Sequence, residues 1–257
     1  MTETKQRAPA APVFCALLLC AALLPAATAA WADGASGGLR LDFGRILPFH
    51  KVFLEGAVNT LKVTFLSLIV GSALGTILAL VKVARIRLLA PLATFYTSVF
   101  RGTPLLVQLF LVYFATPQLM NYQIPPINAV VITFGLNSAA YVSEILRGGI
   151  QSVDAGQREA ALSLGVPYRT MMFDIVIPQA LRTVLPALVN ESIALLKESS
   201  LVATIGMLDM MRAAQTAMNA TYLAFEPFII VAVMYYVLVM ILTFFADRLE
   251  RRLRRSD

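Results

Sequence analysis

Apolar runs long enough to cross a membrane alternate with short polar stretches along most of this chain. Each run predicts a membrane-spanning helix, because about 20 helical residues cross the roughly 30 Å of hydrocarbon in a bilayer. We expect five spans, at residues 58–81, 88–116, 127–145, 185–205 and 228–245. The second contains Arg101-Gly102-Thr103-Pro104, so its first part is interpreted as interfacial or broken. The pattern is typical of an all-α integral membrane protein.

Cationic residues follow alternate spans and predict the topology. Lys82, Arg85 and Arg87 follow the first span, and Arg147 ends the third. The loop before the third span, residues 117–126, contains no Lys or Arg. By the positive-inside rule we expect the mature N-terminus outside and the C-terminus in the cytoplasm, where the arginine-rich tail at 251–257 faces anionic lipid.

Residues 1–30 have the three parts of a secretory signal. Lys5 and Arg7 precede an apolar run at residues 13–24, and small residues follow up to Ala30. A cleaved signal peptide and a retained anchor helix both fit this pattern. Either one exports the polar segment at residues 31–51, so the first span enters the membrane from outside.

The longest polar interruption in the second half lies at residues 151–180. Gly165, followed by Pro167, is typical of a helix stop. We therefore predict a short helix at residues 153–164, a turn, and a second helical piece from near Pro167. A short helix that carries the small residues Ala160 and Ala161 between two spans suits docking into a groove of another protein.

Composition excludes several function classes. The chain is 58% hydrophobic and 14% charged, and its net charge of +6 follows from the topology rather than from a nucleic-acid-binding face. It has no P-loop, one histidine (His50), and two cysteines (Cys15 and Cys20) that both lie in the N-terminal apolar run. We therefore expect no ATP site, no metal site and no catalysis on this chain.

Charged and polar groups inside the spans are the candidate binding residues. An ionised side chain in the bilayer costs a few kcal/mol unless it is paired or faces water. One interpretation is internal pairing, such as Glu144 or Glu198 with Lys197, which would fix helix packing. The other is a water-filled passage in which a carboxylate meets the ammonium group of a substrate. The candidate passage residues are Asn137, Tyr141, Glu144, Asn190, Glu191, Lys197 and Glu198.

The polar interruption carries a motif with strict spacing. It consists of Glu159-Ala160-Ala161, Gly165, Ile175, Ile177 and Pro178. This pattern resembles the EAA loop of ABC importer permeases, with Ile177 where that family more often has Leu. The stretches at residues 100–108, 141–150 and 197–201 are similar to the polar amino acid branch of the family. The likeness covers about residues 53–250.

The resemblance implies a fold, a function and partners. The fold is the type I ABC importer transmembrane domain at residues 52–250, with five core spans and an N-terminal signal-like segment. The implied function is import of a polar or basic amino acid across the bacterial inner membrane. ATP and Mg would bind separate ATPase subunits. A second permease protomer, identical or related, and an external substrate-binding protein would complete the transporter. The implied ATPase-coupling residues are Glu159, Ala160, Ala161, Gly165, Ile175 and Pro178.

Two other function classes remain open at this point. An ion-coupled secondary transporter would use Glu144, Glu191 or Glu198 to take up protons and would work without an ATPase. Five spans without a visible inverted repeat do not favour it. A receptor or scaffold would use the cytoplasmic loop only as a docking site. The identity of the solute is also left open.

Overall fold

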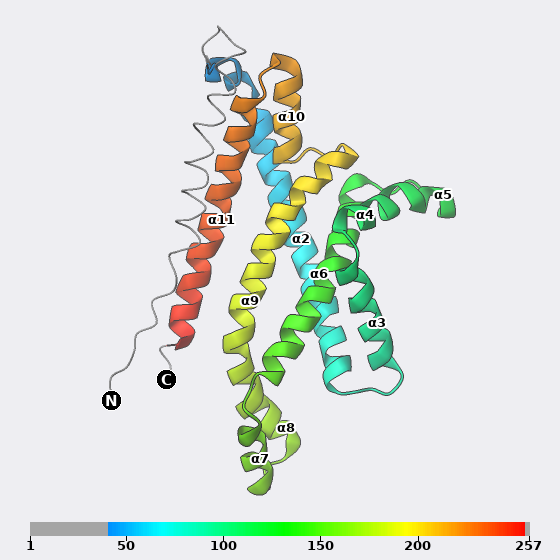
Figure 1. Ribbon diagram of the computed structural model, residues 1–257, viewed down its shortest axis with the longest axis vertical. Coiled ribbons are helices and arrows are strands. Elements are labelled where there is room, and N and C mark those ends of the chain that lie inside the picture. Colours follow the sequence, from blue (N-terminus) through cyan, green and yellow to red (C-terminus); the bar gives the residue numbers. More distant parts are fainter. Residues whose placement is uncertain (1–40, 255–257) are drawn as a thin grey trace, which may run out of the picture. The chain divides into compact units, whose positions relative to one another are not determined.

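The computed structural model describes residues 41–254, and every regular element within that range is a helix (Figure 1). The predicted signal segment at residues 1–30 lies outside the described residues. The α-helices are α2 (His50–Val83), α3 (Leu89–Gly102), α4 (Leu105–Phe110), α5 (Thr116–Met120), α6 (Pro126–Gln151), α7 (Ala155–Ser163), α8 (Tyr168–Thr170), α9 (Ile177–Glu198), α10 (Met210–Thr221) and α11 (Phe225–Arg254). The tighter or wider turns are η1 (Phe43–Arg45), η2 (Leu47–Phe49), η3 (Leu111–Ala115), η4 (Met171–Val176) and η5 (Ser199–Ile205).

Within residues 41–254, four helical stretches are long and apolar enough to cross a membrane: Phe43–Val83, Pro126–Gln151, Tyr168–Ile205 and Phe225–Arg248. Leu89–Gly102 and Leu105–Met120 make a fifth if the bent pair is counted as one span. The helices begin before the predicted starts of the first and fourth spans, at residues 58 and 185. Helix formation continues beyond the apolar run because the backbone hydrogen bonds of a helix are internal and need no hydrocarbon around them.

Small residues bring α2 and α6 together. The buried small and hydroxyl-bearing positions of α2 recur every three or four residues and share one face: Thr60, Thr64, Ser67, Gly71, Gly75 and Ala79. A Cβ built on Gly71 would lie 2.7 Å from Ser138 Cβ, and one on Gly75 would lie 2.7 Å from Val142 Cβ. The small-residue pair in the first span therefore permits a close helix contact within the chain.

The bend between α3 and α4 measures 103° and has a local cause. Thr103 precedes Pro104 and is extended, with φ −119° and ψ 145°, because a proline disfavours helical geometry in the residue before it. The freed carbonyl of Phe100 accepts hydrogen bonds from the side chains of Gln108 (2.9 Å) and Asn137 (3.1 Å). The predicted break in the second span is confirmed, but the chain turns sharply there instead of running straight on.

Two prolines follow widened helical turns at the same spacing. The π-helical turn η3 ends two residues before Pro117, and η4 ends two residues before Pro178. A proline inside a helix lacks an N–H donor, and its ring clashes with the carbonyl four residues earlier. A π turn gives the chain room at that point. Both helices therefore continue past their prolines.

At the end of α2 remote from α7 (Figure 1), Asp209 holds α10 in place. Its carboxylate accepts hydrogen bonds from the backbone N–H groups of Met211 (3.1 Å) and Arg212 (2.8 Å), which makes it the N-cap. Burial raises the pKa of this carboxyl, while the two N–H donors act in the opposite direction. The buried residues of α10, Met210, Ala213, Ala214, Ala217 and Thr221, have amphipathic spacing.

We predict that Gly71→Leu separates α2 from α6, because the added side chain meets Ser138 at the closest point of the contact. Overpacking of this kind costs about 1–3 kcal/mol. The thermal unfolding midpoint in detergent should therefore fall. Gly148→Leu is the matched control, since a Cβ on Gly148 has open space around it. Equal midpoints for the two variants would contradict the packing assignment.

We also predict that Asp209→Ala loosens α10. Loss of an N-cap costs about 1–2 kcal/mol. Hydrogen exchange of the first α10 amides should accelerate, while that of α7 stays unchanged. Asp174→Ala, which removes an exposed carboxylate from the loop at residues 151–180, should leave both rates unaltered. Unchanged α10 exchange in Asp209→Ala would contradict the assigned cap.

Candidate functional site

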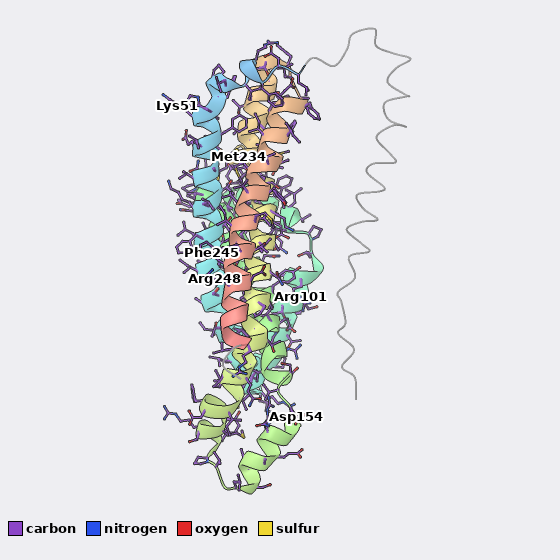
Figure 2. All side chains as sticks on the ribbon, turned by 90° about the vertical axis from the view of Figure 1, so that its left-hand side faces the viewer. Lys51, Arg101, Asp154, Met234, Phe245 and Arg248 are labelled. Atoms are coloured by element: carbon purple, nitrogen blue, oxygen red, sulfur yellow. The ribbon has the colours of Figure 1, made fainter. Side chains whose placement is uncertain are left out.

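The polar loop at residues 151–180 projects beyond the ends of α6 and α9, where α7 and α8 lie (Figure 1). Asp154 and Lys51 mark opposite ends of the helices (Figure 2). α7 and the turn after it therefore lie between the stretches that are apolar enough to cross a membrane, where another protein can reach them.

The short helix α7 (Ala155–Ser163) lies within the predicted range of residues 153–164, and begins two residues later and ends one residue earlier. The Asp154 carboxylate accepts a hydrogen bond from Gly156 N (2.7 Å) at its start. Gly165 has φ +71°, a left-handed conformation that favours glycine, and its N–H donates to Leu162 O (3.0 Å). Val166 N then donates to Ala161 O (3.0 Å), which closes the C-terminal turn.

The motif residues divide between two faces of the loop. Ala161 is 3% exposed and packs in a cluster with Val153, Met171, Val176 and Ala180, against which Ile175 also lies. Glu159 and Ala160 are exposed, and so are Leu162 and Leu164, at 58% and 82%. Ala161 therefore helps to hold the loop together, while Glu159, Leu162 and Leu164 are open to the outside. Pro178 lies in the first turn of α9 and joins the loop to that helix.

Among the polar candidates on α9, Glu191 contacts α6, whereas the other three are exposed. Glu191 accepts a hydrogen bond from the Ser138 hydroxyl of α6 (3.0 Å). Asn190, Lys197 and Glu198 are exposed. Lys197 also lines a hollow of about 340 Å³ between α9, α10 and α11, together with Ser200, Met211, Phe228, Val231, Ala232 and Tyr235. Among the described residues, no group of three or more His, Cys, Asp or Glu side chains can hold a metal ion.

Asn137 and Tyr141 lie on α6 in different surroundings. Asn137 is buried, and its amide donates to Phe100 O and to Gln108 Oε1, both at 3.1 Å. Both hydrogen bonds donated by the Asn137 amide therefore go to residues next to the break between α3 and α4. The ring of Tyr141 is 37% exposed and lies 5.5 Å from the guanidinium carbon of Arg101, in a cation–π arrangement.

Glu144 is the centre of an ion cluster that joins three helices. Its two oxygens lie 2.7 Å from Lys82 Nζ of α2 and 2.6 Å from Arg147 Nη2 of α6. Arg101 of α3 lies further off, with Nη1 3.8 Å from Glu144 Oε2. The predicted pairing of Glu144 with Lys197 is wrong. α2 and α3 bring other cations closer to this carboxylate.

Several residues of these networks, among them Lys82, Ser138 and Gln108, were not among the sequence candidates. Lys82 was interpreted only as a topology marker, although its side chain is 5% exposed and its amine donates hydrogen bonds to Glu144 and Thr97. Ser138 and Gln108 carry no charge and lie in apolar runs, so nothing in the pattern distinguished them. The only available signal was that a polar side chain in a span needs a partner.

Comparisons with known proteins agree on one family. The family model described as binding-protein-dependent transport system inner membrane component matches residues 71–255. The arginine transport system permease protein ArtQ of Bacillus subtilis (strain 168) is 51% identical over 219 residues, which cover 85% of this chain and 100% of that protein. The glutamine transport system permease protein GlnP of Escherichia coli (strain K12) is 35% identical over 217 residues, covering 84% and 99%.

A solved structure supports the same assignment. It is described as an amino acid ABC transporter with histidines, and its chain is 42% identical, with a TM-score of 0.79. The match covers 83% of this chain and 100% of that one. The chain therefore belongs to the binding-protein-dependent transport system inner membrane component family, as a multi-pass permease subunit of an amino acid ABC transporter.

Proposed function

We propose that this permease imports a polar or basic amino acid, and that ATP hydrolysed on separate subunits drives the transport. The observation that carries the proposal is α7, a capped helix beyond the spans that exposes Glu159 and Leu162, with Leu164 exposed at its C-terminal end. Exposed leucines on and next to a capped helix suit the groove of a partner protein. The names of the relatives ArtQ and GlnP support arginine or glutamine as the kind of solute.

The loop has direct connections to two spans. α6 ends at Gln151 just before α7, and the helical stretch that starts at Tyr168 continues into α9. A partner that binds α7 and changes shape with ATP would move both spans together. A conformational change of this kind needs a ligand that binds one conformation of the partner more tightly than the other, and ATP would be that ligand. The ATPase would hold both ATP and Mg.

The proposed assembly follows from the orientation that we propose for the chain in the membrane. The loop at 151–180 faces the cytoplasm, and the cations Arg85, Arg87 and Arg248 lie towards the same side, in keeping with the positive-inside rule. α10 and the start of α2 then face outward, where a substrate-binding protein would dock. A second permease protomer, identical or related, would complete the passage. The mature N-terminus would lie outside and the C-terminus inside.

The proposed passage runs along α6 and α9. Tyr141 is partly exposed, and Asn190, Lys197 and Glu198 are exposed polar groups on segments apolar enough to cross the membrane. Such groups are costly against lipid, so they are expected to face water or a protomer. Glu191 keeps one oxygen towards Ser138 and has a second for a substrate ammonium group. Asn137 and Glu144 support the passage walls through the partners described above.

An ion-coupled secondary transporter is the alternative function. It would move solute through the same groups without any ATPase. The exposed Leu162 and Leu164 would then have no partner, which is why the ABC mechanism is favoured. Uptake by proteoliposomes that contain the permease alone would support the alternative.

We predict that Glu159→Lys and Gly165→Leu uncouple ATP hydrolysis from transport while leaving membrane insertion intact. Glu159 lies on the exposed face, and a leucine at φ +71° costs about 1–2 kcal/mol and displaces the end of α7. Proteoliposomes with the ATPase and the binding protein should lose most ligand-stimulated ATPase activity and uptake of L-arginine and L-glutamine. Asp174→Lys, a charge reversal elsewhere on the loop, is the control. Unaltered uptake in the two α7 variants would remove the coupling assignment.

We also predict that Glu191→Gln lowers uptake about 10- to 100-fold, because a hydrogen bond to a charged group is worth about 1.5–3 kcal/mol. The glutamine retains an oxygen for the Ser138 hydroxyl, so the thermal midpoint should change little. Asp174→Asn, which neutralises an exposed loop carboxylate, should leave uptake unchanged. Normal uptake in Glu191→Gln would show that this carboxylate only packs helices.

A further inference from the structure

The connection between α6 and α7 contains a break in the helical backbone. α6 ends at Gln151 and α7 starts at Ala155. Between them Asp154, which is labelled in Figure 2, has φ −52° and ψ 131°, outside helical geometry. A rotation of the backbone at such a residue changes the direction of the following helix without breaking a hydrogen bond inside either helix. The covalent connection alone therefore lets α7 pivot at Asp154.

One side chain of α7 crosses this break. The Arg158 guanidinium donates a hydrogen bond to the backbone carbonyl of Ile150, in the last turn of α6. Carbonyls in the last turn of a helix lack the usual N–H partner one turn further on. The preceding carbonyls of Gly148 and Gly149 accept from the backbone N–H (2.9 Å) and the hydroxyl (2.8 Å) of Ser152. Arg158 therefore completes the end of α6 from the far side of the break.

The surroundings hold the Arg158 head group at this point. The residue is half-buried, and among the described residues its Nε atom is buried without a hydrogen-bond partner. Ile150 packs against the cluster around Ala161, which also contains Val153 from the break itself. A cation at the carbonyl end of a helix interacts favourably with the helix dipole. The bond from Arg158 to Ile150 thus lies beside packed side chains, where the lower local dielectric strengthens it.

From this end of α6, polar contacts continue to two other helices. Arg147 donates hydrogen bonds to Gln151 and to Glu144, each at 2.6 Å. Glu144 pairs with Lys82 of α2 at 2.7 Å, and the Lys82 amine also donates to Thr97 of α3 (2.6 Å). Packed and hydrogen-bonded networks of this kind can carry a displacement between sites. A movement of the end of α6 would therefore act on α2 and α3 as well.

We propose that Arg158 is a positioning residue that fastens α7 to α6 across the break at Asp154, so that a movement imposed on α7 also moves α6. The inference rests on the proposed function and adds a second route to it. Ala161 and Val176 join α7 to the stretch that leads into α9, whereas Arg158 joins α7 to α6. Without Arg158, α7 still binds the ATPase, but α6 follows its movement incompletely.

Arg158→Met tests the proposal, because methionine keeps an unbranched apolar stem and has no N–H donor on its side chain. In proteoliposomes with the ATPase and the binding protein, this variant should retain ligand-stimulated ATP hydrolysis. Uptake of L-arginine and L-glutamine per ATP should fall roughly tenfold, the effect expected for loss of one hydrogen bond to a charged group. Arg158→Lys, which keeps a cationic donor without the planar fork, should restore part of the uptake.

Arg169→Met is the matched control. The Arg169 guanidinium lies 6.0 Å from the centre of the Phe173 ring. Both residues belong to the helical stretch that begins at Tyr168, so their contact crosses no break. The control removes the same charge and the same donors from the loop at residues 151–180, and it should leave uptake per ATP unchanged.

Spin labels separate positioning from a general loss of structure. They are attached at Gly148→Cys on α6, where an added side chain has open space, and at the exposed Ser163→Cys on α7. Cys15 and Cys20 are replaced by serine. Double electron–electron resonance should give the same intramolecular distance in the nucleotide-free complex and in the complex trapped with ATP and vanadate, because the two helices move together. With Arg158→Met the two states should differ.

The inference is overturned if the label distance already differs between the two states when Arg158 is present, or if Arg158→Met leaves either the distance or uptake per ATP unchanged. Failure of Arg158→Met to co-purify with the ATPase also overturns it, since Arg158 then belongs to the docking surface. An equal loss of uptake in Arg169→Met has the same consequence. Uptake that needs no ATPase contradicts the proposed function instead.

Discussion

Lipid offers no hydrogen-bond partner, so each polar group in the spans of this protein needs a partner from another helix or from water. The bend at Thr103 illustrates the constraint. Ending α3 there frees the carbonyl of Phe100, and Gln108 and Asn137 reach it from α4 and α6. Glu144 illustrates it again, because cations from α2, α3 and α6 surround it. Both networks join α3 to α6, and α6 leads directly to the loop at 151–180.

The same constraint shapes how the loop connects to the membrane part. Pro178 lacks an N–H, yet the chain continues from η4 into α9 because the π turn before it gives the ring room. The loop, the Glu191 carboxylate and the exposed Lys197 therefore belong to one continuous helical stretch. α7 packs on this stretch through Ala161 and Val176. A displacement of α7 would therefore reach the start of α9 through side-chain contacts and not only through the connecting chain.

Several local features could be predicted because each depends on neighbours in the chain. The short helix before Gly165 is one, since the capping residue and the left-handed glycine lie within a dozen positions of each other. The break before Pro104 is another, because proline acts on the residue that precedes it. The exact starts of α2 and α9 could not be predicted. Hydropathy indicates which residues lie in lipid, whereas the end of a helix depends on where its backbone hydrogen bonds stop.

The sequence by itself determined that this chain crosses the membrane several times and carries a short capped helix between two spans, with a motif that resembles the EAA loop. Apolar length, proline, glycine and charge order act locally, so they can be interpreted along one dimension. Only the tertiary structure decided which charges meet. Lys82 and Glu144 are 62 residues apart, and Ser138 and Glu191 are 53 apart. An ion pair depends on distance and direction in space, and these follow from how α2, α3, α6 and α9 pack.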